Sequence, residues 1–418
     1  MILKMPYGIS NFEELITEDY YYVDKTYYIE KLESLPEKRI MFLRPRKFGK
    51  TLFTSVIEYY YDKNRDDKFE KLFKNTYIGK NPTKLKNSYS ILRFNFSGID
   101  TSTEEATIKG FKNEVASSIE VFIHRYNLDF YVNKNDDAEN ILDNLFKAFY
   151  TQRPQEKIYV IIDEYDHFAN ELLGFYPEQF RTLVSKNGKV RKWYEILKKG
   201  TETAVDRIFI TGVAPITLDS LTSGFNIVKD ISQDVEYNDM MGFTKTELVD
   251  ILSSQDILEE EQEKILPIMK ANYDGYNFSL EARNQIYNSN MCLYFLSDYI
   301  RLKEIPRDLV DMNIASDYSK IGKMLDLCKG ENKFEILKKT VQGEPIENDI
   351  VKKFNPAIEF TEIDMISMLY YLGYLTISGE NLGTPELTIP NKVMKEIYAF
   401  YFMQLIDKEA EFRIDSTV

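Results

Sequence analysis

Residues 40–51, Ile-Met-Phe-Leu-Arg-Pro-Arg-Lys-Phe-Gly-Lys-Thr, constrain the fold more than any other stretch of this sequence. The apolar run 40–43 has the length of a short buried strand. Proline and glycine in 44–49 mark a turn, and the apolar spacing in 50–60 predicts a helix. Strand, loop, Gly-Lys-Thr and helix in this order predict a phosphate-binding loop of the Walker A type.

The residue types of this loop suit phosphate chemistry. Backbone N–H groups of the loop and of the first helical turn would surround phosphate oxygens. Lys50 would reach the β- and γ-phosphates of a nucleotide, and the hydroxyl of Thr51 would ligate Mg²⁺. The residues that we expect to contact the nucleotide are Arg44, Arg46, Phe48, Gly49, Lys50, Thr51 and Leu52.

The loop departs from the consensus Gly-x-x-x-x-Gly-Lys-[Ser/Thr] at its first position, where Arg44 replaces glycine. Glycine normally supplies backbone freedom there. Together with Pro45, Arg46 and Lys47, this substitution makes the loop stiffer and more cationic, and Gly-Lys-Thr alone also fits an ordinary surface loop. Two roles remain open for Arg44 and Arg46, which are contact with phosphate and bracing of the loop through acids such as Asp166.

A second motif lies at residues 157–164, where the apolar run 158–162 ends in Asp163 and Glu164. A strand that is apolar on both faces suits the centre of a parallel sheet, and its carboxylates would emerge at the edge where open α/β sheets bind ligands. Asp163 would hold Mg²⁺ beside Thr51, and Glu164 would act as general base toward water. A strand that ends in solvated acids is the ordinary alternative, but the two motifs in this order predict a nucleotide site.

Further strands and helices alternate along the first half of the chain. Strands are expected at 90–97 and 206–213, with amphipathic helical patterns between them. Thr211 ends the second strand where additional-strand ATPases keep a polar residue near the γ-phosphate, although threonine at a strand end is ordinary. We group it with Lys50 and Glu164 as the expected catalytic residues. The alternation predicts an α/β protein with a parallel sheet and helices on both faces.

Three domains are expected. Residues 1–238 form a P-loop core with an N-terminal lead-in, where Asp24 or Thr26 is expected to cap a helix rather than to contact nucleotide. Helical patterns dominate residues 239–350 and predict a lid. In residues 351–418, a helix followed by two short strands is typical of a winged helix. A winged helix can read DNA, but the few basic residues here favour a packing and control role.

Composition excludes several classes of protein. The chain of 418 residues has a formal net charge of −14, which argues against a general nucleic-acid coat. No apolar run approaches the roughly 18 residues of a membrane helix, and the N-terminus lacks a signal peptide's apolar region. Cys292 and Cys328 imply no disulfide framework, and two histidines leave little for a zinc site. We therefore expect a cytoplasmic protein without membrane association.

With these motifs in place, the sequence resembles a bacterial AAA-ATPase-like family whose members often carry a C-terminal PD-(D/E)XK-type nuclease domain. In that family Arg-Pro-Arg-x-Phe-Gly-Lys-[Ser/Thr] is the usual loop, so the resemblance implies that Arg44 is a family trait. We expect a shorter member or a truncated chain, and nuclease activity is not carried over. The resemblance rests on residues 8–12, 22–26, 44–51, 162–166, 211–215, 221–226, 274–278, 370–375 and 389–391.

The sequence therefore predicts an ATP-binding and ATP-hydrolysing P-loop switch of the additional-strand (AAA or STAND-like) type, with ATP and Mg²⁺ as ligands and a lid and winged helix that respond to nucleotide state. One alternative is a non-hydrolysing scaffold that binds a protein partner, and another is a DNA-binding regulatory ATPase that acts with a nuclease. Adenine is favoured over guanine, because residues 133–136, Asn-Lys-Asn-Asp, follow no apolar strand. Expected partners are nucleotide, a protein or second copy of the chain, and DNA through the winged helix.

Overall fold

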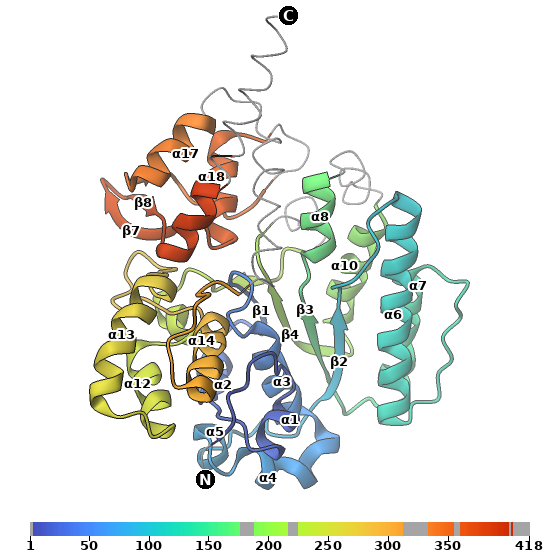
Figure 1. Ribbon diagram of the computed structural model, residues 1–418. Helices are drawn as coiled ribbons and strands as arrows, with labels where there is room; N and C mark the ends of the chain where they lie inside the picture. Colours follow the sequence, from blue (N-terminus) through green and yellow to red (C-terminus); the bar gives the residue numbers. More distant parts are fainter. Residues whose placement is uncertain are drawn as a thin grey trace, which may run out of the picture.

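The computed structural model describes residues 3–175, 188–215, 225–311, 333–354, 360–400 and 403. Residues 221–224 of the family resemblance, Cys328 and, in the last expected domain, residues 355–359, 401–402 and 404–418 lie outside these ranges. The described residues form an α/β region, a helical region and a small antiparallel sheet, which follow one another along the chain (Figure 1). The expected α/β class is confirmed.

Five parallel strands form the central sheet in the order β2-β3-β4-β1-β5. β4 lies between β1 and β3, as expected of an additional strand. Pairing of Phe42 with Thr211 and of Asn95 with Asp163 brings the carboxyl ends of β1 to β4 to one edge. The strands are β1 (Arg39–Leu43), β2 (Ser90–Asn95), β3 (Ile158–Asp163), β4 (Val205–Gly212) and β5 (Lys229–Asp230).

Helices cover both faces of the sheet, because successive strand side chains point to opposite sides. On β2, Arg93 contacts Glu58 of α3 (Lys50–Tyr61), whereas the ring of Phe94 packs edge-on against Trp193 of α10 (Lys189–Gly200), with centroids 5.0 Å apart. α6 and α7 lie beside β2 at one end of the sheet (Figure 1). The remaining helices of this region are α1 (Phe12–Thr17), α2 (Tyr27–Ser34), η1 (Lys63–Lys68), α4 (Phe69–Phe73), α5 (Tyr77–Lys80), α6 (Glu104–Tyr126), α7 (Ala138–Gln152) and α8 (His167–Phe175).

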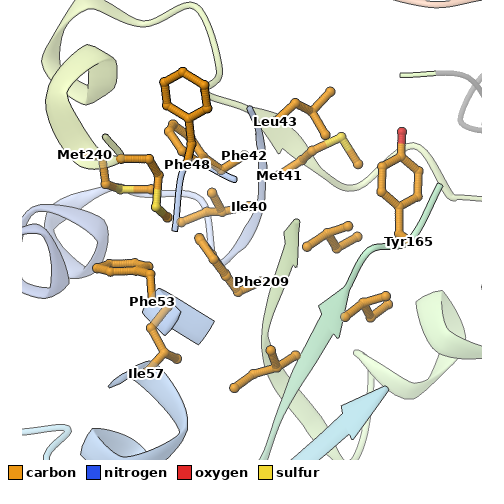
Figure 2. Packing of buried hydrophobic residues seen from close by; sticks show 14 of the residues in the cluster. Ile40, Met41, Phe42, Leu43, Phe48, Phe53, Ile57, Tyr165, Phe209 and Met240 are labelled. Atoms are coloured by element: carbon orange, nitrogen blue, oxygen red, sulfur yellow. The ribbon is translucent and has the colours of Figure 1, made fainter. Parts of the chain in front are cut away.

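An apolar core joins the sheet to the loop that follows β1 (Figure 2). The strand residues 40–43 are all buried, and Phe53 and Ile57 of α3 pack beside them. The ring of Phe53 lies 6.1 Å, centroid to centroid, from Phe209 of β4. Because β1 and the start of α3 share this core, the loop between them is fixed at both ends.

The N-terminal lead-in differs from the sequence-based expectation. Residues 21–26 form no regular element. Thr26 occupies the N-cap position of α2 but makes no side-chain capping bond there. Its hydroxyl accepts the N–H of Ile78, and the carboxylate of Asp24 accepts the N–H of Tyr77. Asp24 also accepts the N–H and the hydroxyl of Thr26, but α2 has no side-chain capping bond, so the expected capping of α2 is wrong.

The second half of the described chain is mostly helical, as the sequence indicates. η2 (Val235–Met240) follows the sheet, and a capping box of Thr244 and Glu247 opens α12. The antiparallel sheet has the order β6-β8-β7. The expected helix and hairpin are present, whereas a winged-helix fold stays a prediction. The elements are α12 (Lys245–Ser254), α13 (Glu259–Tyr273), α14 (Ser289–Leu302), α17 (Lys333–Gln342), β6 (Ile346–Glu347), α18 (Glu362–Tyr371), β7 (Thr376–Asn381) and β8 (Thr384–Thr388).

Across the described ranges, no helix has the length and apolar character needed to cross a membrane.

Candidate functional site

The loop between β1 and α3 presents its backbone to a cavity. Gly49 is the N-cap of α3 and has a φ of 97°, a left-handed conformation that glycine adopts without strain. Because Gly49 has no side chain to cap the helix, the N–H groups of the first turn stay available to an anion. Lys47 also has a positive φ, of 69°. The loop therefore turns sharply at two places in front of a helix N-terminus.

The cavity has a volume of about 460 Å³, which lies in the usual range for small-molecule sites. Its loop end is lined by residues 46–52 together with Glu164 and His167. The rest of the lining is mainly apolar and comes from the N-terminal lead-in, residues 240–243, α12 and α14. The apolar lining includes Ile9, Leu15, Tyr22, Met241, Phe243 and Leu293.

Arg44 is the one expected nucleotide contact that does not line the cavity. Its side chain is buried, and its guanidinium donates to the carbonyl oxygens of Leu43, Ser232 and Tyr237 at 2.9, 2.7 and 2.9 Å. Burial lowers the pKa of Arg44 to about 10. Of the two roles left open for this residue, bracing agrees with the geometry and phosphate contact does not. The bracing acceptors are backbone carbonyls rather than acids such as Asp166.

Aromatic rings hold the inner side of the loop. The guanidinium of Arg44 lies between the rings of Phe42 and Phe278, at 4.2 and 4.1 Å from their centroids. Phe48 is buried, and its ring packs edge-on against Phe278 and Tyr276, with centroids 5.5 and 4.9 Å apart. Phe278 therefore contacts both ends of the loop. Phe48 lines the cavity and at the same time anchors the loop in the helical region.

Lys50 is buried at the loop end of the cavity. Its Nζ donates to the carbonyl oxygens of Arg44 and Pro45, both at 2.9 Å. Burial lowers the pKa of Lys50 to about 8, against the influence of nearby carboxylates, of which Glu164 is the strongest.

Asp163 and Thr211, which the sequence placed on separate strands, meet at the carboxyl edge of the sheet. The hydroxyl of Thr211 donates to Oδ1 of Asp163 at 2.7 Å, and both residues are fully buried behind the cavity. Arg93 of β2 donates to Oδ2 of Asp163 at 3.2 Å. The hydroxyl of Thr54 donates to the carbonyl of Thr51 at 2.8 Å and lies 3.4 Å from Oδ2 of Asp163. Thr54 thus links the two residues expected to hold Mg²⁺.

Glu164 has a φ of 50°, an uncommon value for a non-glycine residue and one that clusters at functional sites. Its carboxylate lines the cavity, and Oε2 lies 3.4 Å from Nδ1 of His167. The same Nδ1 lies 3.1 Å from the guanidinium of Arg46. A guanidinium only donates, so a hydrogen bond from Arg46 requires the tautomer in which Nδ1 accepts and Nε2, 3.6 Å from Glu171, carries the proton. The expected general base and a loop arginine therefore meet at His167.

The sequence patterns did not point to Arg93, Thr54 or His167. A signal for Thr54 exists in α3, where polar residues at 51, 54, 58 and 62 recur with helical spacing in an otherwise apolar segment. Arg93 and His167 carry no such local signal, because their partners come from other strands and helices.

The donor chemistry beside the loop suits Mg²⁺. This ion prefers oxygen ligands and commonly binds through one or two carboxylates together with substrate phosphates. The hydroxyl of Thr51 and the carboxylate of Asp163 are such ligands, and the carbonyl of Thr51 is tied to Thr54 beside Asp163. Within the described part of the chain, no group of three or more His, Cys, Asp or Glu side chains is placed to hold a metal ion.

Comparisons with known proteins agree with this geometry. A family model described as "Predicted AAA-ATPase" matches residues 6–222, which include the loop, both expected carboxylates and Thr211. A curated protein of Azotobacter chroococcum mcd 1, named "Uncharacterized protein in vnfD 5'region", is 28% identical to this chain over 287 residues. The match covers 68% of this chain and 50% of that protein, so the chain spans about half the length of the curated relative.

Proposed function

The chain belongs to the predicted AAA-ATPase family, and we propose that it binds ATP at the loop between β1 and α3 and hydrolyses it with Mg²⁺. The observation that carries this proposal is the convergence of Lys50, Glu164 and the Asp163–Thr211 pair at the carboxyl ends of three adjacent strands. Ligands bind at this edge in open α/β sheets.

Each residue has a distinct proposed role. Lys50 neutralises phosphate charge, and Thr51 and Asp163 hold Mg²⁺, which shields the charge of the phosphates. Glu164 accepts a proton from water while the water oxygen bonds to the γ-phosphorus and the bond to the β–γ bridging oxygen breaks, giving ADP and phosphate. Thr211 fixes one oxygen of Asp163, which supports an orienting role for its hydroxyl.

We further propose that the regions after the sheet respond to the nucleotide, as the lid (239–350) and the C-terminal domain (351–418) of a core formed by residues 1–238. Contacts with the loop support this. The carbonyl of Phe48 accepts the N–H of Gly242 at 3.0 Å. A methyl group at Gly373 would lie 2.8 Å from Cβ of Pro45, so the loop packs closely against the segment after α18.

A nucleotide-binding scaffold with little turnover is the second candidate. The observation that favours it is the packing of Arg44 and Phe48 around Phe278, which restrains the loop. In such a scaffold the bound nucleotide would stabilise a surface for a protein partner rather than be consumed. The position of Glu164 on the cavity wall favours the enzyme.

Phosphate release and nucleotide binding, measured on the same samples, separate the two candidates. In the enzyme, Glu164→Gln lowers turnover by about 10²- to 10⁴-fold and keeps Mg-ATP affinity, because it removes the base and no binding group. Lys50→Ala loses both properties. Glu202→Gln, the same change at an exposed residue before β4, is the control and leaves both unchanged. Slow turnover that Glu164→Gln does not alter would favour the scaffold.

A further inference from the structure

A series of ion pairs, in which the carboxylates are buried and the two arginines are partly exposed, starts at Asp163 and continues along α3 away from the cavity. The guanidinium of Arg93 lies 3.2 Å from Asp163 and 3.1 Å from Oε2 of Glu58. The other oxygen of Glu58 pairs with Arg125 at 2.7 Å, and Arg125 lies 3.4 Å from Asp62. The side chains of Asp163 and Asp62 are fully buried. Positive and negative groups therefore alternate along the series.

Arg93 is held on three sides. Its NH2 group donates to the hydroxyl of Thr54 at 3.1 Å as well as to Asp163, and its NH1 group donates to Glu58. Burial opposes the charge of Glu58, but Arg125 and Arg93 outweigh burial, so the pKa of Glu58 is lowered and its carboxylate stays ionised. The position of Arg93 is thus set by two charged partners and a hydroxyl.

The two oxygens of Asp163 are consequently both engaged, Oδ1 by Thr211 and Oδ2 by Arg93. The charge of the carboxylate that is expected to bind a metal ion is already balanced by a guanidinium. A divalent cation that approaches Asp163 meets the positive charge of Arg93 beside a fully buried carboxylate, where charges are less screened than in bulk water.

We propose that Arg93 is a positioning residue that keeps Asp163 from binding a divalent cation without nucleotide, so that the metal ion enters only together with nucleotide phosphates. This inference rests on the proposed function, because it takes Asp163 as a metal ligand. Phosphates bring negative charge that outweighs Arg93. Glu58 then remains as a partner for Arg93, so Asp163 is released without leaving the guanidinium unpaired.

Binding of Mn²⁺, followed by the paramagnetic resonance signal of the free ion, tests the proposal on the full chain with and without ADP. We expect Arg93→Gln to bind Mn²⁺ alone at least about tenfold more tightly than wild type, because an adjacent charge of this kind shifts carboxylate equilibria by a factor of ten or more. Arg93→Lys keeps the charge and should behave as wild type. Arg125→Gln is the matched control, since Arg125 pairs with Glu58 rather than Asp163.

Adding Asp163→Asn to Arg93→Gln should abolish the gain. Equal Mn²⁺ affinity of wild type and Arg93→Gln without nucleotide would overturn the proposal, and so would an equal gain in Arg125→Gln. If Arg93→Gln does not fold, the wild-type protein alone still tests the proposal. Equally tight Mn²⁺ binding by wild type with and without ADP would contradict it. Absence of ADP binding would instead refute the proposed function, while the nucleotide-free comparison continues to report on Arg93.

Discussion

The loop between β1 and α3 has different kinds of residue on its two sides. On the cavity side lie Gly49, the ammonium of Lys50 and the start of α3. On the inner side, Arg44 and Phe48 are buried among aromatic rings and carbonyl oxygens. Two cations of one short loop therefore have different surroundings, since Lys50 lines the cavity and Arg44 braces the loop.

This contrast also explains how the loop tolerates the loss of its first consensus glycine. Arg44 holds the loop through three carbonyl groups and two rings, so the backbone is fixed by packing at the position where glycine would give freedom. The cavity side retains glycine at position 49, where a φ of 97° requires it.

The largest effect on stability is expected for Arg44→Ala. Three buried carbonyl acceptors lose their donor together, so the free energy of unfolding should fall by about 3–4 kcal/mol, as measured by denaturant titration without nucleotide. Lys47→Ala, a change of an exposed cation in the same loop, should alter it by less than about 1 kcal/mol. If Arg44→Ala kept its stability but lost ATP affinity, Arg44 would act on the cavity side of the loop. The two sides of the loop would then not differ as described.

Lys50→Met should have the next largest effect on stability, and it should raise the free energy of unfolding where Arg44→Ala lowers it. Burial lowers the pKa of Lys50 from 10.5 to about 8, so between these values the unfolded chain binds the proton more tightly and the stability of the folded chain rises with pH. Near neutral pH the buried charge is a cost, and Lys50→Met should stabilise the nucleotide-free chain by up to about 3 kcal/mol.

Denaturant titrations in EDTA across this pH window measure the effect. The variant should lack the rise that wild type shows between about pH 8 and 10.5. Parallel stability curves for the two proteins would mean that Lys50 is not buried in the folded chain.

Gly49→Ala should produce the smallest change in stability. A methyl group at Gly49 meets only the hydroxyl of Ser289, at 4.0 Å, so the cost is the left-handed backbone, about 1–2 kcal/mol. Gly383→Ala is the matched control, because Gly383 has a φ of 87°, faces open space and lies in the β7–β8 turn. Both variants should lose similar stability, but only Gly49→Ala should weaken Mg-ATP binding. Equal ATP affinity in the two variants would mean that Gly49 does not contact the nucleotide.

Local sequence patterns were sufficient for the parts of the site that are local. The strand, loop and helix at 39–61 and the strand that ends at Asp163 follow from hydrophobic periodicity and turn residues. Thr211 and Asp163 are in contact because their strands, β4 and β3, are parallel neighbours in the sheet.

The orientation of Arg44 and the role of Arg93 were beyond these patterns. Arg44 turns inward because Phe278 and Ser232, distant in sequence, supply a ring and a carbonyl there. Arg93 reaches Asp163 because β2 pairs with β3 and α3 covers that face of the sheet. The charge of a residue is visible in sequence, but its partners depend on tertiary packing.

Calorimetric titration with Mg-ATP tests the central claim, that the cavity side of the loop binds nucleotide phosphates, most directly. Wild type should bind one nucleotide per chain, and Lys50→Ala should bind at least about tenfold more weakly, because a charged hydrogen-bond donor is lost. Lys38→Ala, the same change beside the other end of β1, should bind as wild type does. Absence of binding by wild type, or equal affinity in Lys50→Ala, would contradict the account.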